Sequence, residues 1–175
     1  MPTLNLQQTE LGGERYRIVV FSDLPSLTLQ HTVDVDYRLS ADDREAMRWY
    51  LEDYLDKPFA PNPEIAARTE ARMAALGGEL FERLFDGRKM IEWWGRAKDR
   101  LPELRIEVST SVAAATAIPW ELLRDPVTDT ALALEAREFV RSHRDAKRQP
   151  AVPAPGESLR ILLVICRPRE DRDVP

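Results

Sequence analysis

The 175-residue sequence contains few of the residues on which extracellular proteins, metalloproteins and many hydrolases depend. It has one cysteine, Cys166, and two histidines, His31 and His143. A single cysteine excludes an internal disulfide and is typical of a protein in a reducing cytosol. The sequence has no Gly-rich phosphate loop, no Gly-x-Ser-x-Gly motif, no His-Glu-x-x-His motif and no cluster of metal ligands. We therefore expect no cofactor-binding and no metal-binding residues.

Long apolar runs and an excess of positive charge are also missing. The chain carries 25 Lys and Arg against 30 Asp and Glu, a net charge of −5, which argues against a general binder of nucleic acid or of anionic membranes. No apolar run approaches the length needed to span a membrane, and the N-terminus lacks the pattern of a secretory signal. With 43% hydrophobic and 31% charged residues, the composition is that of an ordinary globular domain, and we expect a cytoplasmic location.

The N-terminal part predicts a two-stranded antiparallel hairpin after a loose lead-in, residues 1–15. Residues 16–21 are rich in β-forming side chains, and residues 33–39 alternate apolar with charged side chains, as a half-exposed strand does. The charged side of the second strand carries Asp34 and Asp36. This pair could suggest an acid/base or metal site, but no neighbouring group completes one, so a solvated strand face is favoured.

The next segment predicts a helix that begins at Ser40, with Asp43 in position to complete a capping box. Its apolar side chains recur at helical spacing and are expected to form one apolar stripe along the helix. They are Ala46, Met47, Tyr50, Leu51, Tyr54 and Leu55. A second helix is expected after it, with Asn62 as N-cap and Pro63 in the first turn.

The second helix contains Gly77 and Gly78, each of which costs about 1 kcal/mol relative to alanine. Either the helix breaks at this pair, or another backbone packs against it. The side chains expected to be buried are Ile65, Met73, Leu76, Leu80, Phe81, Leu84 and Phe85. A third helix, from Arg88, carries Trp93 and Trp94, for which core packing is favoured over base stacking. Because adjacent helical residues point in different directions, we expect one tryptophan in the core and the other at its rim or in an interface.

The following residues predict a strand, a compact plug and short mixed elements. Residues 104–109 alternate as a strand does. Trp120, Leu122 and Leu123 supply a large apolar plug, beside which Arg124 and Asp125 could pair locally. Residues 131–141 are compatible with short strands or with a helix.

The C-terminal part predicts a linker followed by a buried strand. Residues 142–158 are rich in proline and begin with the basic residues Arg144, Lys147 and Arg148. This basic end could contact a phosphate, but the composition favours a solvated hinge. Residues 159–166 are expected to form this strand, because six successive apolar residues, 161–166, stand between Arg160 and Arg167, the pattern of a strand buried on both faces.

Several of these pieces, taken in order, resemble a known family. They are Ile118-Pro119-Trp120-Glu121-Leu122-Leu123-Arg124-Asp125-Pro126, Leu132-Ala133-Leu134, Phe139-Val140-Arg141, the Pro-rich linker, and Leu159-Arg160-Ile161-Leu162-Leu163-Val164 before Arg167-Pro168. They resemble the opening of a CHAT domain, a family of caspase- and separase-like proteins often fused to TPR repeats. Residues 44–54 and 78–85 resemble the region that often precedes this motif. The Pro-Trp-Glu-Leu-Leu block belongs to the scaffold of the family, not to its chemistry.

The resemblance implies an α/β (α+β) caspase-like fold with helices packed on a mixed sheet. Residues 1–141 would be the N-terminal support or pseudo-protease region, residues 142–158 the linker, and residues 159–175 the first core strand with part of a loop. Active members are cysteine endopeptidases, like those of peptidase family C14. In them a thiolate attacks the scissile carbonyl, a histidine shuttles the proton and backbone amides hold the oxyanion. Both dyad residues follow the first core strand in such folds, so we assign no catalytic residue here.

The residues that are present do not predict a dyad either. Cys166 ends an apolar run, where a thiol is usually a small hydrophobic group with little thiolate. His31 heads the second hairpin strand and His143 lies in the basic linker, and neither has an orienting Asp or Asn in a motif. We therefore expect the 175 residues to have no enzymatic activity of their own.

Two functional classes follow from the sequence. In the first, the chain is the N-terminal, non-catalytic segment of a bacterial CHAT-type cysteine protease of a defence or signalling system, and its partner is the rest of that protease. In the second, it is a stand-alone interaction or regulatory module. Either way we expect protein partners, no nucleic acid and no membrane, with self-association through an exposed strand edge as one outcome.

Overall fold

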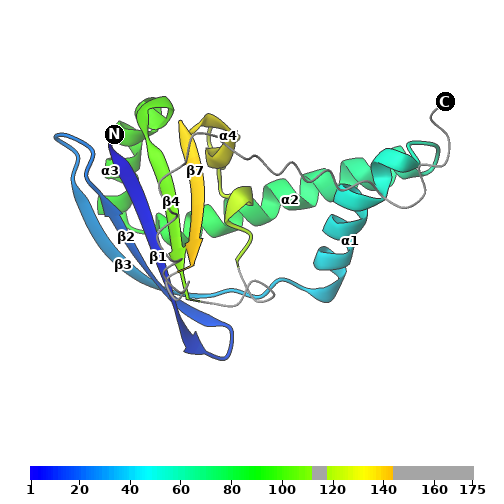
Figure 1. Ribbon diagram of the computed structural model, residues 1–175, viewed down its shortest axis with the longest axis horizontal. Helices are drawn as coiled ribbons and strands as arrows, with labels where there is room; N and C mark the ends of the chain where they lie inside the picture. The colour runs from blue at the N-terminus through cyan, green and yellow to red at the C-terminus, as the bar shows by residue number, and fades with distance from the viewer. Residues whose placement is uncertain (112–117, 144–175) are drawn as a thin grey trace, which may run out of the picture. The chain divides into compact units, whose positions relative to one another are not determined.

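The computed structural model describes residues 1–111 and 118–143 as an α/β unit built on one mixed sheet (Figure 1). The sheet has five strands in the order β3-β2-β1-β4-β7. The strands are β1 Thr3–Gly12, β2 Arg15–Ser22, β3 Leu29–Asp36, β4 Arg105–Thr110 and β7 Glu138–His143, with β5 Arg124–Asp125 and β6 Thr130–Ala131 forming a separate small hairpin. The helices are α1 Ala41–Glu52, α2 Asn62–Leu84, α3 Arg88–Ala97 and α4 Leu132–Glu135. The predicted α/β class with a mixed sheet is confirmed.

The middle strand of the sheet is β1, which corrects the prediction that residues 1–15 are a loose lead-in. Leu4 and Leu6 are fully buried and alternate with half-buried polar residues, a period-two pattern that marks a strand. In the register, Leu6 lies opposite Val20 of antiparallel β2 and opposite Val108 of parallel β4. The predicted antiparallel pairing of the next two strands is confirmed as β2 and β3.

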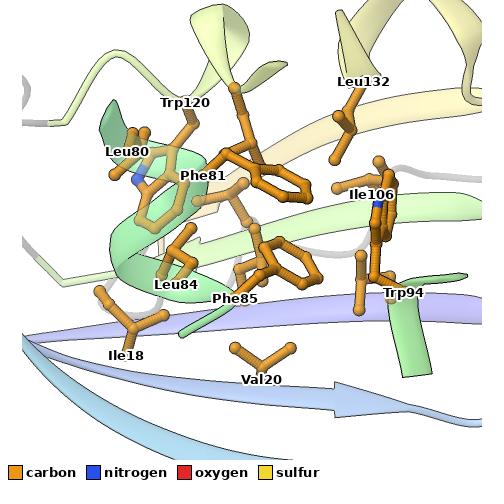
Figure 2. Packing of buried hydrophobic residues seen from close by; sticks show 14 of the residues in the cluster. Ile18, Val20, Leu80, Phe81, Leu84, Phe85, Trp94, Ile106, Trp120 and Leu132 are labelled. Atoms are coloured by element: carbon orange, nitrogen blue, oxygen red, sulfur yellow. The ribbon is translucent and has the colours of Figure 1, made fainter. Parts of the chain in front are cut away.

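The hydrophobic core lies on one face of this sheet, under the C-terminal half of α2 and under α3. Phe81 and Phe85 of α2 stack on each other with ring centroids 4.3 Å apart, and Trp94 of α3 packs against both at 5.2 and 5.1 Å. Figure 2 shows these rings above Ile18 and Val20 of the sheet. The core therefore joins one sheet face to one end of the long helix.

Both tryptophans of α3 are buried, which corrects the prediction that one lies at the rim. Trp93 and Trp94 are each 6% exposed. The Trp93 indole N–H donates to the Leu27 carbonyl at 2.6 Å, and the Trp94 indole N–H donates to Asp125 Oδ2 at 2.8 Å. Because each indole N–H has an acceptor inside the fold, neither ring needs to reach water.

The first two helices begin at, or within one residue of, the positions that the sequence predicts. The Ser40 hydroxyl accepts from the Asp43 N–H at 2.9 Å, which confirms the predicted N-cap of α1. The second cap is displaced by one residue, because Pro61 is the N-cap of α2 and Asn62 is already helical. The Asn62 amide instead donates to the Lys57 carbonyl at 2.7 Å.

The last described strand, β7, runs through Ser142 and His143, two residues that the sequence assigns to the linker. The rest of that linker and the strand predicted at residues 159–166 lie outside the described residues. Of the described helices, not one combines the length and the apolar character needed to cross a membrane.

Tyr37 is buried at the start of the connection from β3 to α1, and its hydroxyl has no hydrogen-bond partner in the structure. Burial, together with the nearby carboxylate of Glu79, raises the pKa of Tyr37 to about 12. The folded-state pKa of Tyr37 therefore exceeds the ordinary value of about 10 that applies to the unfolded chain. Below pH 10 this difference does not change the free energy of unfolding. Between pH 10 and 12 the free energy of unfolding falls, because only the unfolded state ionises there.

We expect Tyr37→Phe to change the free energy of unfolding by no more than about 1 kcal/mol at neutral pH, because it removes a hydroxyl that has no partner. The variant should also lose the most alkaline step of the tyrosine absorbance titration. An unchanged titration would contradict the assignment of that step to Tyr37.

Candidate protein-interaction site

The Pro119–Leu123 block forms a structural plug, as the sequence predicts. Trp120 opens a 3₁₀ turn, Trp120–Leu122, and is fully buried together with Leu123. Its indole N–H donates to Oε1 of buried Gln8 on β1 at 3.0 Å. This bond joins the plug to the central strand of the sheet, 112 residues away in the sequence.

The turn after Trp120 lies directly on α2 at Gly77. A Cβ atom built on Gly77 would lie 1.9 Å from the Leu122 carbonyl oxygen and 2.9 Å from its carbon. At Gly78 the nearest atom is Pro126 Cβ, at an ordinary 3.7 Å. The helix continues unbroken through both glycines, so the alternative of a second backbone packed against it is confirmed and the alternative of a helix break is wrong.

Asp125 is not the partner of Arg124, which corrects the predicted local pair. Arg124 bonds Oδ1 of Asp129 at 2.7 Å. Asp125 is 2% exposed and accepts from the Trp94 indole and, at 2.8 Å, from the Val127 N–H. Burial alone would raise the pKa of this carboxyl, but the hydrogen bonds outweigh it and hold the pKa below its usual value. Residues 124–129 are thus fixed as a rigid turn beside α2.

A groove of about 360 Å³ lies between this turn region and the two helices α1 and α2. Tyr50 of α1 lies on one wall, Met73 of α2 on another, and Leu122 and Leu134 on the third. The Tyr50 hydroxyl donates to Glu70, which holds α1 against α2. The groove is therefore an opening between two fixed parts of the fold.

The helix α1 and the residues after it expose large apolar side chains. Leu51, Leu55 and Phe59 are 65%, 77% and 75% exposed, and α1 has no buried residue at all. The predicted apolar stripe is present at helical spacing; four of its members are half-buried, and Leu51 and Leu55 are exposed. In Figure 1, α1 lies beside the N-terminal part of α2, away from the sheet. We refer to residues 41–73 as the arm.

Arg72 fixes the arm by joining α2 to the start of α1. Its guanidinium donates to Asp43 at 2.9 and 3.1 Å. These hydrogen bonds, opposed by partial burial, hold the pKa of Asp43 below its usual value. A lowered folded-state pKa means that the stabilisation is complete above the unfolded value of about 3.9 and is lost as pH falls through the folded-state pKa.

We expect Asp43→Asn to lower the free energy of unfolding by about 1 kcal/mol or less at pH 7, because the guanidinium is half exposed and water screens the pair. At a pH well below the folded-state pKa, wild type and variant should unfold at the same urea concentration. A difference that persists in acid would show that the ion pair is not its cause.

The second part of the candidate site is the sheet edge at β7. Strand β7 pairs in parallel with β4 and has no other partner strand among the described residues. Arg141 on β7 donates to the Ile118 carbonyl at 2.9 Å and to Glu121 at 3.0 Å, which locks the edge to the plug. An unpaired edge is a template for another strand. The arm, the groove and this edge therefore form a candidate protein-interaction site.

The histidines considered as catalytic candidates lie on opposite edges of the sheet. His31 is on β3, and His143 ends β7 opposite Thr110 of β4. Four interstrand spacings, about 19 Å, separate these two edge strands. Cys166 lies outside the described residues.

The carboxylates of the second hairpin strand are engaged in ion pairs. Asp34 accepts from Arg17 at 2.7 and 2.8 Å, and hydrogen bonding from this guanidinium holds the pKa of Asp34 below its usual value. Asp36 lies 3.7 Å from Arg15. Within residues 1–111 and 118–143, no three His, Cys, Asp or Glu side chains gather as metal ligands would.

Comparison of the chain with protein-family models, with curated proteins and with solved structures finds no match.

Proposed function

We propose that this chain is the N-terminal, non-catalytic segment of a bacterial CHAT-type caspase-like cysteine protease. In this proposal it supports and regulates a protease core that lies beyond Pro175, in the cytoplasm. Two features support it: the order of sequence pieces from Ile118 to Pro168, and the exposed apolar arm. The arm carries the argument, because three large apolar side chains on one short segment are the property of a surface that another polypeptide covers.

The free energy expected from burying these three side chains is large enough to support a protein interface. Full burial of an aliphatic or aromatic side chain contributes about 1.5–3 kcal/mol. Covering Leu51, Leu55 and Phe59 would therefore contribute roughly 5 kcal/mol or more before the cost of association. The groove of about 360 Å³ between α1, α2 and the turn region would add further contacts, and so would the edge of β7.

In the proposed protease, the described sheet is the front part of a caspase-like fold and residues 159–166 form its first core strand. The thiolate and the histidine that shuttles its proton would come from the part beyond Pro175. The role of the described residues would be to position that part: the plug fixes β7, and β7 offers the edge on which further strands assemble.

The alternative is a stand-alone interaction or regulatory module that keeps the scaffold without catalysis. The same exposed arm favours it, because Leu51, Leu55 and Phe59 need a partner chain but not a protease. The two proposals differ in what the gene encodes after Pro175.

Sequencing the coding DNA beyond codon 175 separates them. The protease proposal predicts a continuing reading frame with a histidine and a later cysteine, each after an apolar strand. Replacing that cysteine by alanine should abolish peptide cleavage, whereas His31→Ala should leave cleavage intact because His31 lies on the far edge strand. A stop codon directly after Pro175 would overturn the protease proposal and leave the interaction module.

A further inference from the structure

A second hollow, apart from the arm, lies at the C-terminal end of α2. It measures about 450 Å³ and is lined mainly by apolar side chains of α2, α3 and the turn after β5. Phe81, Phe85 and Trp94 form its floor, and Figure 2 shows these three rings together. Ile91 and Val127, 63% and 88% exposed, stand at its rim. We call this hollow the aromatic pocket.

One wall of the aromatic pocket has a residue without a side chain, which leaves space in the pocket. Gly95 of α3 is one of its lining residues, and a Cβ atom built there would meet nothing within 4 Å. Its volume is within the range of about 300–1,000 Å³ that is typical of ligand sites. Apolar rim residues above a ring-lined floor are suited to one large apolar side chain.

The aromatic pocket adjoins a larger hollow of about 670 Å³ between α2 and the edge strand β3. The two hollows share the lining residues Glu82 and Asp86. Neither of these carboxylates forms an ion pair with any described residue, whereas Arg83 between them donates to the Asp36 carbonyl at 2.6 Å. The carboxylates of Glu82 and Asp86 therefore lie, without an ion pair to a described residue, where the aromatic pocket and the larger hollow meet.

The negative charge that the two hollows offer to a ligand comes mainly from Glu82 and Asp86. The other carboxylates that line the larger hollow, Asp34, Asp36 and Glu79, are paired with Arg17, Arg15 and Arg72. The aromatic pocket has one lysine, Lys98, against Glu82, Asp86 and the internally bonded Asp125. Anionic ligands such as phosphate groups are disfavoured, and basic residues next to an apolar anchor are complementary.

We propose that this composite site binds a basic peptide segment. One leucine- or phenylalanine-sized side chain of the segment enters the aromatic pocket between Ile91 and Val127. Neighbouring arginine or lysine side chains reach Glu82 and Asp86. Strand β3 is the last strand of the described sheet on this side, so its backbone is available to a peptide that runs on through the larger hollow. The inference does not rest on the protease proposal, because it uses the opposite end of α2.

The test measures binding of fluorescein-labelled peptides to the full chain by fluorescence anisotropy. One peptide carries a central phenylalanine flanked by arginines, a second replaces the arginines by glutamates, and a third replaces the phenylalanine by glycine. We expect each replacement to weaken binding at least about tenfold, which corresponds to about 1.4 kcal/mol. Equal binding of the arginine and glutamate peptides would overturn the proposal, as would the absence of binding by the first peptide.

Two variants locate the site. Ile91→Asp places a charge at the rim of the aromatic pocket, and we expect it to weaken binding of the arginine peptide at least about tenfold. The double variant Glu82→Gln, Asp86→Asn should weaken that peptide and reduce its preference over the glutamate peptide. Leu11→Asp is the matched control, because Leu11 is also an exposed leucine, 43% exposed, but lies in β1 and lines neither hollow. Weakening by Leu11→Asp and not by Ile91→Asp would place the peptide elsewhere and contradict the proposal.

Discussion

Gly77→Ala is expected to lower the free energy of unfolding by about 3 kcal/mol, whereas Gly78→Ala is expected to raise it by up to about 1 kcal/mol. The reason is the position of the 3₁₀ turn on α2. The new Cβ at position 77 would lie 1.9 Å from the Leu122 carbonyl oxygen, a backbone atom that cannot move without the turn. The Cβ at position 78 makes only an ordinary contact, so that variant keeps the gain in helix propensity.

Urea unfolding of the two variants, followed by far-ultraviolet circular dichroism, measures this difference. The adjacent substitutions have the same chemistry in the same helix, so they are controls for each other. If both stabilised the fold, α2 and the turn would not be in contact as described. If both destabilised it equally, the effect would belong to the helix and not to its packing.

Trp120→Ala is expected to have the other large effect, a loss of about 3–5 kcal/mol. The side chain is fully buried, and its removal leaves a cavity between the turn and the sheet. It also removes the donor to Gln8 Oε1, so a buried amide oxygen loses its described hydrogen-bond partner. Because marginal stability is typical of domains of this size, we expect much of the variant to be unfolded at 37 °C.

Trp49→Ala provides the comparison, because Trp49 is a half-buried residue of α1 outside the core. We expect it to cost about 1 kcal/mol or less. Thermal unfolding by calorimetry measures both variants. Equal effects of the two substitutions would contradict the interpretation of residues 119–123 as a structural plug.

Local chemistry explains most of the elements that the sequence predicted correctly. The Ser40 cap depends on residues three apart, and the pairing of β2 with β3 depends on two adjacent alternating strands. The plug at Trp120 was predicted from its large apolar side chains. Each of these signals is contained in a few neighbouring residues, so no knowledge of distant contacts was needed.

The predictions that were wrong concern pairing and burial, which depend on residues far apart in the sequence. The alternation of Leu4 and Leu6 with polar residues is a local signal for β1, but only two apolar residues carry it, and their burial depends on pairing with β4, about 100 residues later in the sequence. The exposure of Leu51 and Leu55 could not be predicted, since an apolar stripe has the same spacing whether its own chain or a partner covers it.

The sequence therefore predicted that a strand edge would be part of the candidate site, but not which strand, and it did not predict the aromatic pocket. A free strand edge was expected at a strand that lies outside the described residues; among the described strands, β7 is an edge strand paired only with β4. The aromatic pocket needed three elements to meet, namely α2, α3 and the turn after β5. No local pattern in Ile91 or Val127 indicates that they share one rim.

The central claim is that the apolar arm is a surface for another polypeptide. The most direct measurement is size-exclusion chromatography with light scattering and hydrophobic-dye fluorescence on the full chain and on the double variant Leu51→Asp, Leu55→Asp. The account predicts that the wild type binds dye and associates at increasing concentration. The double variant should do neither while unfolding at the same temperature, and Ile91→Asp should associate like the wild type. A wild-type chain that elutes as a clean 20.1 kDa monomer without dye binding would contradict it.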